Sequence, residues 1–231
     1  MNPLAQATNG APALECVELQ TQPDPTASII WLHGLGADGF DFVPVVRELQ
    51  ALGAPAARYV FPHAPLRPVT INGGYVMRAW FDIRGAQIDQ QEDEAGFRQS
   101  QGQVQALIER EVQRGMPRSR IVLAGFSQGG AITLQAGLRQ PEPLSALVVL
   151  SAYLPLAASA SAEATLAARL MPIFMGHGRD DTVVPIAHGR AARDALLALG
   201  CRVQWHEYAI PHSVSEEEIQ DLARFLSEAL K

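Results

Sequence analysis

Residues 120–138 read RIVLAGFSQGGAITLQAGL, and this stretch decides the fold. Residues 120–125 are an apolar run, which is typical of strands buried on both faces of a helix-covered sheet. After a glycine-rich turn, Ala131, Leu134 and Leu138 recur at i, i+3 and i+7, the spacing of one helix face. The stretch therefore predicts a strand, a tight turn and a helix in direct succession.

The same alternation continues on both sides of this stretch. Further apolar runs predict strands over residues 28–32, 58–61, 146–150, 172–175 and 202–205, with an antiparallel strand over 16–19 at the start. Amphipathic patterns predict helices over residues 93–114 and 187–199, and a capping-box spacing of Ser215 and Glu218 predicts a last helix. Alternating strands and helices predict an α/β fold with a mostly parallel central sheet covered by helices on both faces. We expect a single domain over residues 14–231 and a loose lead over residues 1–13.

Composition excludes several classes of protein. Of the 231 residues, 48% are hydrophobic and 18% are charged, which is enough apolar material for one sizeable core. The formal net charge is −6 and no run of Lys or Arg interrupts it, so nucleic acid is not an expected partner. The sequence lacks a secretory signal and any stretch near the roughly 18 apolar residues of a spanning helix. We therefore expect a cytoplasmic protein with no transmembrane segment, in which Cys16 and Cys201 are free thiols.

The turn after the strand over 120–125 contains a G-x-S-x-G motif, Gly125-Phe126-Ser127-Gln128-Gly129. Short motifs of this kind recur by chance, but here the context is the strand–turn–helix that a nucleophile elbow requires. Glycines leave room for a strained and crowded turn, and the helix N-terminus favours negative charge beside the serine. Ser127 is therefore a candidate nucleophile, and an incidental serine in a glycine-rich loop is the alternative.

A serine nucleophile needs a base beside it and a third group that orients the base. In hydrolases with this elbow, the acid and then the histidine follow the serine along the chain. Asp180 and Asp181 follow the strand expected at 172–175, and reasoning from the residues leaves both open as the acid. His212 lies between the last strand and the last helix, where the base is expected. Two further histidines, each followed by a glycine just after a strand, are expected to position backbone: His33 and His177.

Six segments, in order along the chain, carry a resemblance to a known family: WLHGLGADG (31–39), FPHAPLRPVTINGGYVMRAWFDI (61–83), GFSQGG (125–130), LSAYLP (150–155), HGRDDTVVP (177–185) and PHSVS (211–215). In these segments the chain resembles the bacterial carboxylesterase and acyl-protein thioesterase family, also called the phospholipase/carboxylesterase family. The resemblance implies an α/β-hydrolase fold with no large cap domain.

The resemblance also implies roles for the candidate residues. Ser127 would be the nucleophile and His212 the base. Asp181 would be the acid, because it stands two residues before the Val pair in the family's H-G-x-x-D-x-V-V-P pattern. Asp180 occupies a variable position of that pattern.

The remaining site residues come from the same resemblance. The backbone N–H groups of Leu35 and Gln128 would form the oxyanion hole, in agreement with the general geometry of such sites. Leu35 and Trp80 are expected to make apolar contacts with the substrate. For Trp80, plain core packing is the alternative.

The expected activity is hydrolysis of carboxylic esters and thioesters by a Ser-His-Asp acyl-enzyme mechanism, as in carboxylesterases, acyl-protein thioesterases and lysophospholipases. Neither a metal nor a cofactor is required. The expected partners are a small or lipid-like acyl ester or an S-acylated protein, and a homodimer is compatible with the sequence. The alternatives are a non-catalytic ligand-binding module on the same fold and a hydrolase of another acyl substrate such as an amide.

Overall fold

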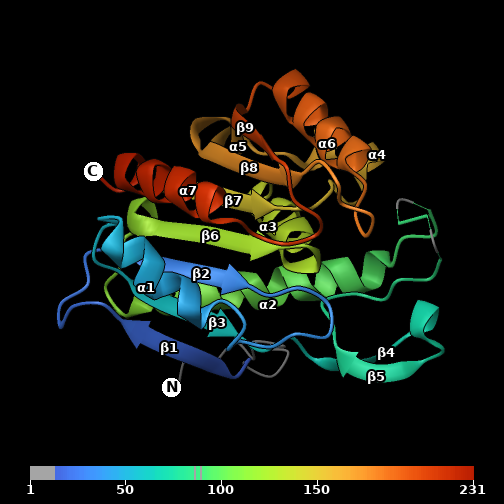
Figure 1. Cartoon of the computed structure of the whole chain (residues 1–231), viewed down its shortest axis with the longest axis horizontal. Coiled ribbons are helices and arrows are strands. Elements are labelled where there is room, and N and C mark those ends of the chain that lie inside the picture. Colours follow the sequence, from blue (N-terminus) through green and yellow to red (C-terminus); the bar gives the residue numbers. More distant parts are fainter. Residues whose placement is uncertain (1–13, 86, 89) are drawn as a thin grey trace, which may run out of the picture.

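A computed structural model describes residues 14–85, 87–88 and 90–231, so the lead expected over residues 1–13 lies outside the described residues. Seven strands form one sheet in the order β1-β3-β2-β6-β7-β8-β9 (Figure 1). All neighbours are parallel except β1, which pairs antiparallel with β3 as predicted. The strands are β1 (Cys16–Gln20), β2 (Ser28–Leu32), β3 (Arg58–Pro62), β6 (Ile121–Phe126), β7 (Ala146–Leu150), β8 (Pro172–Gly178) and β9 (Arg202–Tyr208). A separate antiparallel hairpin, β4 (Leu66–Val69) and β5 (Tyr75–Arg78), projects from one end (Figure 1).

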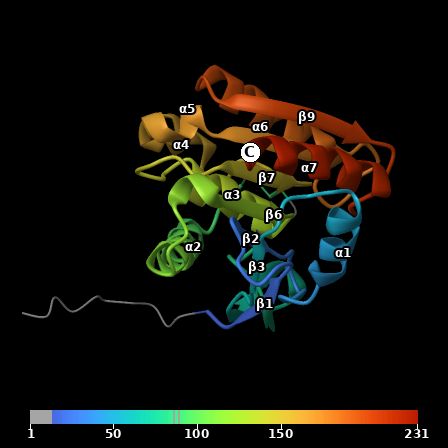
Figure 2. The same cartoon turned by 90° about the vertical axis from the view of Figure 1, so that its left-hand side faces the viewer.

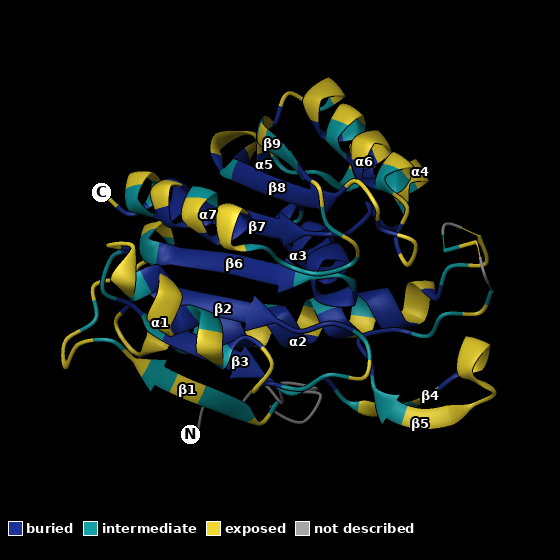
Figure 3. Ribbon diagram, in the orientation of Figure 1, coloured by how far each residue is buried: buried dark blue, intermediate teal, exposed yellow. Residues whose placement is uncertain are grey.

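Helices cover both faces of the sheet (Figure 2). One buried cluster joins the sheet to α2 (Glu94–Gln113), α3 (Gln128–Gly137) and α6 (Ile186–Ala198). The other cluster joins the opposite face to α1 (Val43–Ala51) and α7 (Glu216–Ala229). Short helices complete the chain: α4 (Ala157–Glu163), α5 (Leu166–Leu170) and the 3-10 turns η1 (Thr70–Asn72) and η2 (Arg118–Arg120). Because both faces are covered, every residue of β2 and β7 is buried, while the helices expose their outer sides (Figure 3).

Two strands depart furthest from their predicted bounds. β8 and β9 each extend three residues further, and the added pairs are Gly176↔His206, His177↔Glu207 and Gly178↔Tyr208. Apart from Tyr208, these residues are polar or lack a side chain, so hydrophobicity did not indicate a continued strand. They belong to the strands because their backbones pair with each other.

The last helix follows its predicted pattern. The Glu218 N–H donates to Ser215 Oγ at 3.1 Å, which caps the N-terminus of α7. Ile219, Leu222 and Leu226 form its buried stripe. Both cysteines are free thiols, as expected.

The sheet brings several loops to one edge. Leu32 is in register with Gly125, and Gly178 with Tyr208, so β2, β6, β8 and β9 end at the same side. Parallel strands gather functional groups at their carboxyl ends. Within the part of the chain that the structure describes, none of the helices has the length and apolar character needed to cross a bilayer.

Candidate active site

Ser127 stands at the turn between β6 and α3 in a strained conformation. Its φ is 55° and its ψ is −119°, which residues other than glycine rarely adopt. The backbone is held there from both sides, because Ser127 N–H donates to Leu150 O at 2.9 Å and Ala131 N–H donates to Ser127 O at 3.0 Å. The turn thus presents the serine side chain at the carboxyl edge of the sheet.

The glycines of the motif are required by close approach of backbones. A Cβ on Gly125 would lie 2.3 Å from Gly129 O, and a Cβ on Gly129 would lie 2.2 Å from Leu32 O. Neither neighbour is a flexible side chain that could move aside. The elbow therefore requires glycine at both positions, because the backbones of β2, β6 and α3 are in direct contact and leave no room for a Cβ.

Three side chains from distant loops meet at this edge. His212 Nε2 lies 2.9 Å from Ser127 Oγ, and His212 Nδ1 lies 2.6 Å from Asp181 Oδ2. The Phe126 ring, with its centroid 4.7 Å from that of His212, packs against the imidazole. Asp180 is exposed, whereas Asp181 is 5% exposed, so the two adjacent carboxylates occupy different environments. The structure brings Ser127, His212 and Asp181 together and leaves Asp180 outside.

The Asp181 carboxylate is oriented by backbone. Its Oδ1 accepts the N–H groups of Val183 at 2.9 Å and Val184 at 2.8 Å, which leaves Oδ2 for His212. Buried His177 is bonded through Nε2 to Val184 O at 2.8 Å, and the same nitrogen lies 3.5 Å from Asp181 Oδ2. Burial lowers the pKa of His177, which favours its neutral form. His177 thus holds backbone around the carboxylate, as the sequence predicted.

The loop that contains Leu35 lies against Ser127. A Cβ on Gly34 would be 3.5 Å from Ser127 Cβ, so the residue that precedes Leu35 packs against the serine. Gln128 is the first residue of α3, and N–H groups in a first helical turn have no acceptor within the helix. The positive end of the helix dipole adds to this local preference for negative charge.

The chain matches the family model described as Phospholipase/Carboxylesterase over residues 14–230. It belongs to the phospholipase/carboxylesterase family. It is 36% identical to acyl-protein thioesterase 1 of Cryptococcus neoformans var. neoformans serotype D, over 95% of this chain and 99% of that protein. It is 38% identical to acyl-protein thioesterase 1 of Mycosarcoma maydis, over 89% of this chain and 92% of that protein. The crystal structure of Arabidopsis thaliana SOBER1 superposes with a TM-score of 0.83 at 33% identity, covering 89% of this chain and 99% of that one.

These likenesses confirm the α/β-hydrolase fold without a large cap. As a member of the phospholipase/carboxylesterase family, the chain is a serine hydrolase that acts on carboxylic esters, homologous to acyl-protein thioesterases. Acyl esters are the substrate class that this family implies.

One expectation for this phospholipase/carboxylesterase needs correction, and it concerns the side chain of Trp80. We expected its side chain to contact the substrate, but it is fully buried at 0% exposure, and its indole N–H donates to His33 O at 2.9 Å. The alternative of core packing therefore holds, because no surface of Trp80 remains for an acyl chain. Leu35, by contrast, is half-buried.

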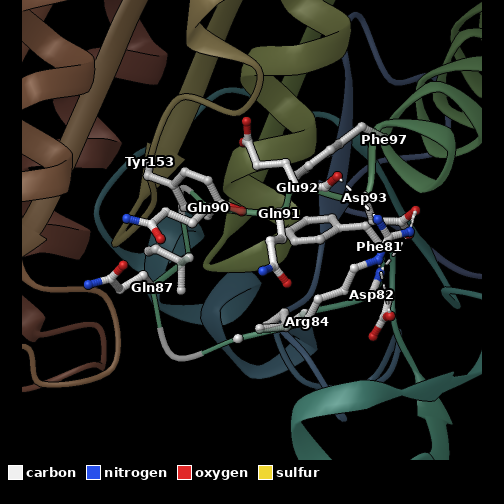
Figure 4. A pocket seen from close by; sticks show the side chains of 13 residues that line it. Phe81, Asp82, Arg84, Gln87, Gln90, Gln91, Glu92, Asp93, Phe97 and Tyr153 are labelled. Carbon is white, nitrogen blue, oxygen red and sulfur yellow. Dashed lines mark hydrogen bonds and ion pairs between the residues drawn. The ribbon is translucent and has the colours of Figure 1, made fainter.

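A small cavity beside the segment after β5 is lined by the residues that Figure 4 draws, which are residues 81–85, 87–88 and 90–93 together with Phe97 and Tyr153. The Asp93 carboxylate holds this segment in place, because it accepts hydrogen bonds from Arg84 Nη2 at 2.8 Å and from the Asp82 N–H at 2.9 Å (Figure 4). The cavity volume is about 10 Å³, which is the space of about one water. An acyl chain would enter it only if the segment moved.

Sequence reasoning missed two features of this site. One is the Phe126 ring that packs against His212, and the other is the inward side chain of Gln128. Both residues occupy variable positions of G-x-S-x-G, so the motif carried no signal for either.

Among the described residues, no group of three His, Cys, Asp or Glu side chains could hold a metal ion.

Proposed function

We propose that Ser127, His212 and Asp181 hydrolyse carboxylic esters and thioesters through an acyl-enzyme. One observation carries the proposal: a single imidazole lies 2.9 Å from the serine oxygen and 2.6 Å from a buried carboxylate. This is the arrangement that turns a weak hydroxyl nucleophile into a strong one.

In the first step, Ser127 Oγ attacks the acyl carbonyl while His212 Nε2 takes the hydroxyl proton. Asp181 keeps the Nδ1–H tautomer in place and stabilises the imidazolium that forms. His212 then returns the proton to the leaving alcohol or thiol, and the acyl group remains on Ser127. This division of roles requires Nε2 to be free of a proton before attack, so it assigns the ring proton to Nδ1.

In the second step, water takes the place of the leaving group. His212 Nε2 accepts a proton from the water as it attacks the acyl-enzyme, and the proton then passes to Ser127 Oγ when the carboxylic acid leaves. In both steps the negative charge on the former carbonyl oxygen would be received by the N–H groups of Leu35 and Gln128. The helix dipole of α3 acts in the same direction.

For the substrate, we propose small or lipid-like acyl esters and S-acylated proteins. Support for the thioester comes from the two relatives named acyl-protein thioesterase 1, which match nearly the whole chain. An amide hydrolase would use the same three residues, so only substrate profiling separates these activities.

The decisive experiment is labelling with a fluorophosphonate, followed by peptide mass spectrometry. The proposal expects the label on Ser127 and none on the Ser127→Ala variant, whose kcat should fall by about 10⁶. A ligand-binding module would stay unlabelled. A panel of acyl esters from short to long, with an S-acylated peptide, a lysophospholipid and an acyl amide, then ranks the substrate classes by kcat/KM.

A further inference from the structure

Residues 78–81 form hydrogen bonds both to the loop that contains Leu35 and to the side chain of Gln128, the residues of the two proposed oxyanion donors. Toward the Leu35 loop, Arg78 O accepts the Gly36 N–H at 2.9 Å, and the Trp80 indole N–H donates to His33 O at 2.9 Å. The loop is thereby held on each side of Leu35.

Toward α3, the same segment bonds to the side chain of Gln128. Gln128 Oε1 accepts the Trp80 backbone N–H at 3.0 Å, and Gln128 Nε2 donates to Phe81 O at 3.0 Å. The side-chain amide therefore satisfies two backbone groups of this segment, the Trp80 N–H and the Phe81 carbonyl. Because the backbone N–H of Gln128 is the second proposed donor, these bonds also restrict how that N–H is aimed.

The His33 ring completes the connection. Its Nε2 accepts the Ala64 N–H at 3.0 Å, so the proton must sit on Nδ1, which donates to Gly34 O at 2.7 Å. Burial lowers the pKa of His33 to about 4, so the ring keeps this neutral form at neutral pH. Trp80, His33 and Gln128 are 0%, 2% and 3% exposed, and water cannot replace the bonds between them.

We propose that Trp80 and the side chain of Gln128 are positioning residues, which hold the N–H groups of Leu35 and Gln128 at a fixed separation for the oxyanion. This inference rests on the proposed function and deepens it. Oxyanion donors act only when they lie 2.7–3.1 Å from the charge that develops in the transition state. Loosening their separation should therefore reduce kcat and leave KM nearly unchanged, because the ground-state carbonyl gains little from them.

The chain offers a matched control for Trp80. Trp31 in β2 is 2% exposed and stacks on Phe42, but its indole nitrogen has no hydrogen-bond partner among the described residues. Trp31→Phe and Trp80→Phe remove the same atoms from buried positions on the two faces of the sheet. Only Trp80→Phe also removes a hydrogen bond to the Leu35 loop.

Steady-state ester hydrolysis by the two variants tests the proposal. We expect Trp80→Phe to lower kcat by about 10- to 100-fold with KM within about twofold, less than the effect of deleting a donor outright. Trp31→Phe should keep kcat within about threefold. The inhibition constant of a trifluoromethyl ketone, whose adduct places an oxyanion in the same position, should rise in Trp80→Phe alone. Equal effects of the two variants on kcat and on this inhibition would overturn the proposal.

A second pair of variants covers the case in which Trp80→Phe does not fold. Gln128→Glu keeps the shape of the side chain but sets a carboxylate oxygen against Phe81 O. Gln140 is likewise buried at 1% exposure and donates to Ala136 O, so Gln140→Glu is the control. The proposal expects kcat to fall, with KM nearly unchanged, in Gln128→Glu and not in Gln140→Glu. Equal losses of kcat in the two variants would refute it.

The fluorophosphonate experiment tests the proposed function separately. If the wild type fails to react with the fluorophosphonate, the proposed function itself is wrong.

Discussion

His212 Nδ1 lies 2.6 Å from Asp181 Oδ2, although the two residues are 31 positions apart in the chain. Two backbone N–H groups bind the other carboxylate oxygen, Oδ1, and hold the carboxylate in place. Oδ2 is therefore the oxygen that accepts the imidazole N–H. Asp180, one residue earlier, points its carboxylate to solvent while its own N–H donates to Ile210 O at 3.1 Å.

This difference predicts opposite outcomes for two neighbouring substitutions. Asp181→Asn should lower kcat for ester hydrolysis by about 10⁴, because an amide cannot hold the imidazole in the required tautomer or stabilise its cation. Asp180→Asn should leave kcat within about twofold, since exposed charges away from the reaction contribute little. Steady-state kinetics of both variants checks the assignment. A crippled Asp180→Asn enzyme beside an active Asp181→Asn enzyme would reverse it.

Glu218 predicts a pH dependence of stability. Its side chain is 1% exposed at the start of α7, and burial, followed by the nearby Asp221, raises the pKa of its carboxyl to about 8. Because the folded-state pKa lies above the unfolded one, its contribution is fully present below about pH 4.5 and is lost as the pH rises toward 8. The wild type should therefore lose up to about 1.4 kcal/mol per pH unit in this range relative to Glu218→Gln.

Urea unfolding at pH 5, 7 and 9 measures this effect. The advantage of Glu218→Gln over the wild type should grow with pH. Glu217→Gln is the matched control, because Glu217 lies on the same helical turn and its substitution removes a carboxylate that is exposed instead of buried. A constant difference between Glu218→Gln and the wild type would show that the carboxyl does not titrate in this range.

The elbow predicts that two glycines respond in opposite directions to alanine. Gly129→Ala places a methyl group 2.2 Å from Leu32 O and should destabilise the fold by more than about 3 kcal/mol. Gly102, within α2, has no atom outside its own helix within 4 Å of the added Cβ. Gly102→Ala should therefore stabilise by about 0.5–1 kcal/mol, because alanine loses less backbone entropy in a helix. Unfolding midpoints in urea compare the two, and an unchanged midpoint for Gly129→Ala would contradict the steric account.

Much of this molecule follows from its sequence alone. The apolar runs located β2 and β7 at their observed bounds, and the pattern of Ser215, Ile219, Leu222 and Leu226 located α7, because burial imposes a local period on each element. The carboxyl-edge loops of a parallel sheet are the available places for such groups, which indicated Ser127, His212 and the adjacent Asp180 and Asp181, and only the family resemblance favoured Asp181 over Asp180.

Tertiary structure decided the partners of polar side chains. The ends of β8 and β9, the burial of Trp80 and the inward pairing of Gln128 depend on contacts between segments far apart in sequence. Ser127 and His212 are separated by 85 positions, and Trp80 and Gln128 by 48. Hydrophobic periodicity reports which face of an element is buried, but it does not report which donor meets which acceptor. That choice is made only when the elements pack and each buried polar group must find a partner.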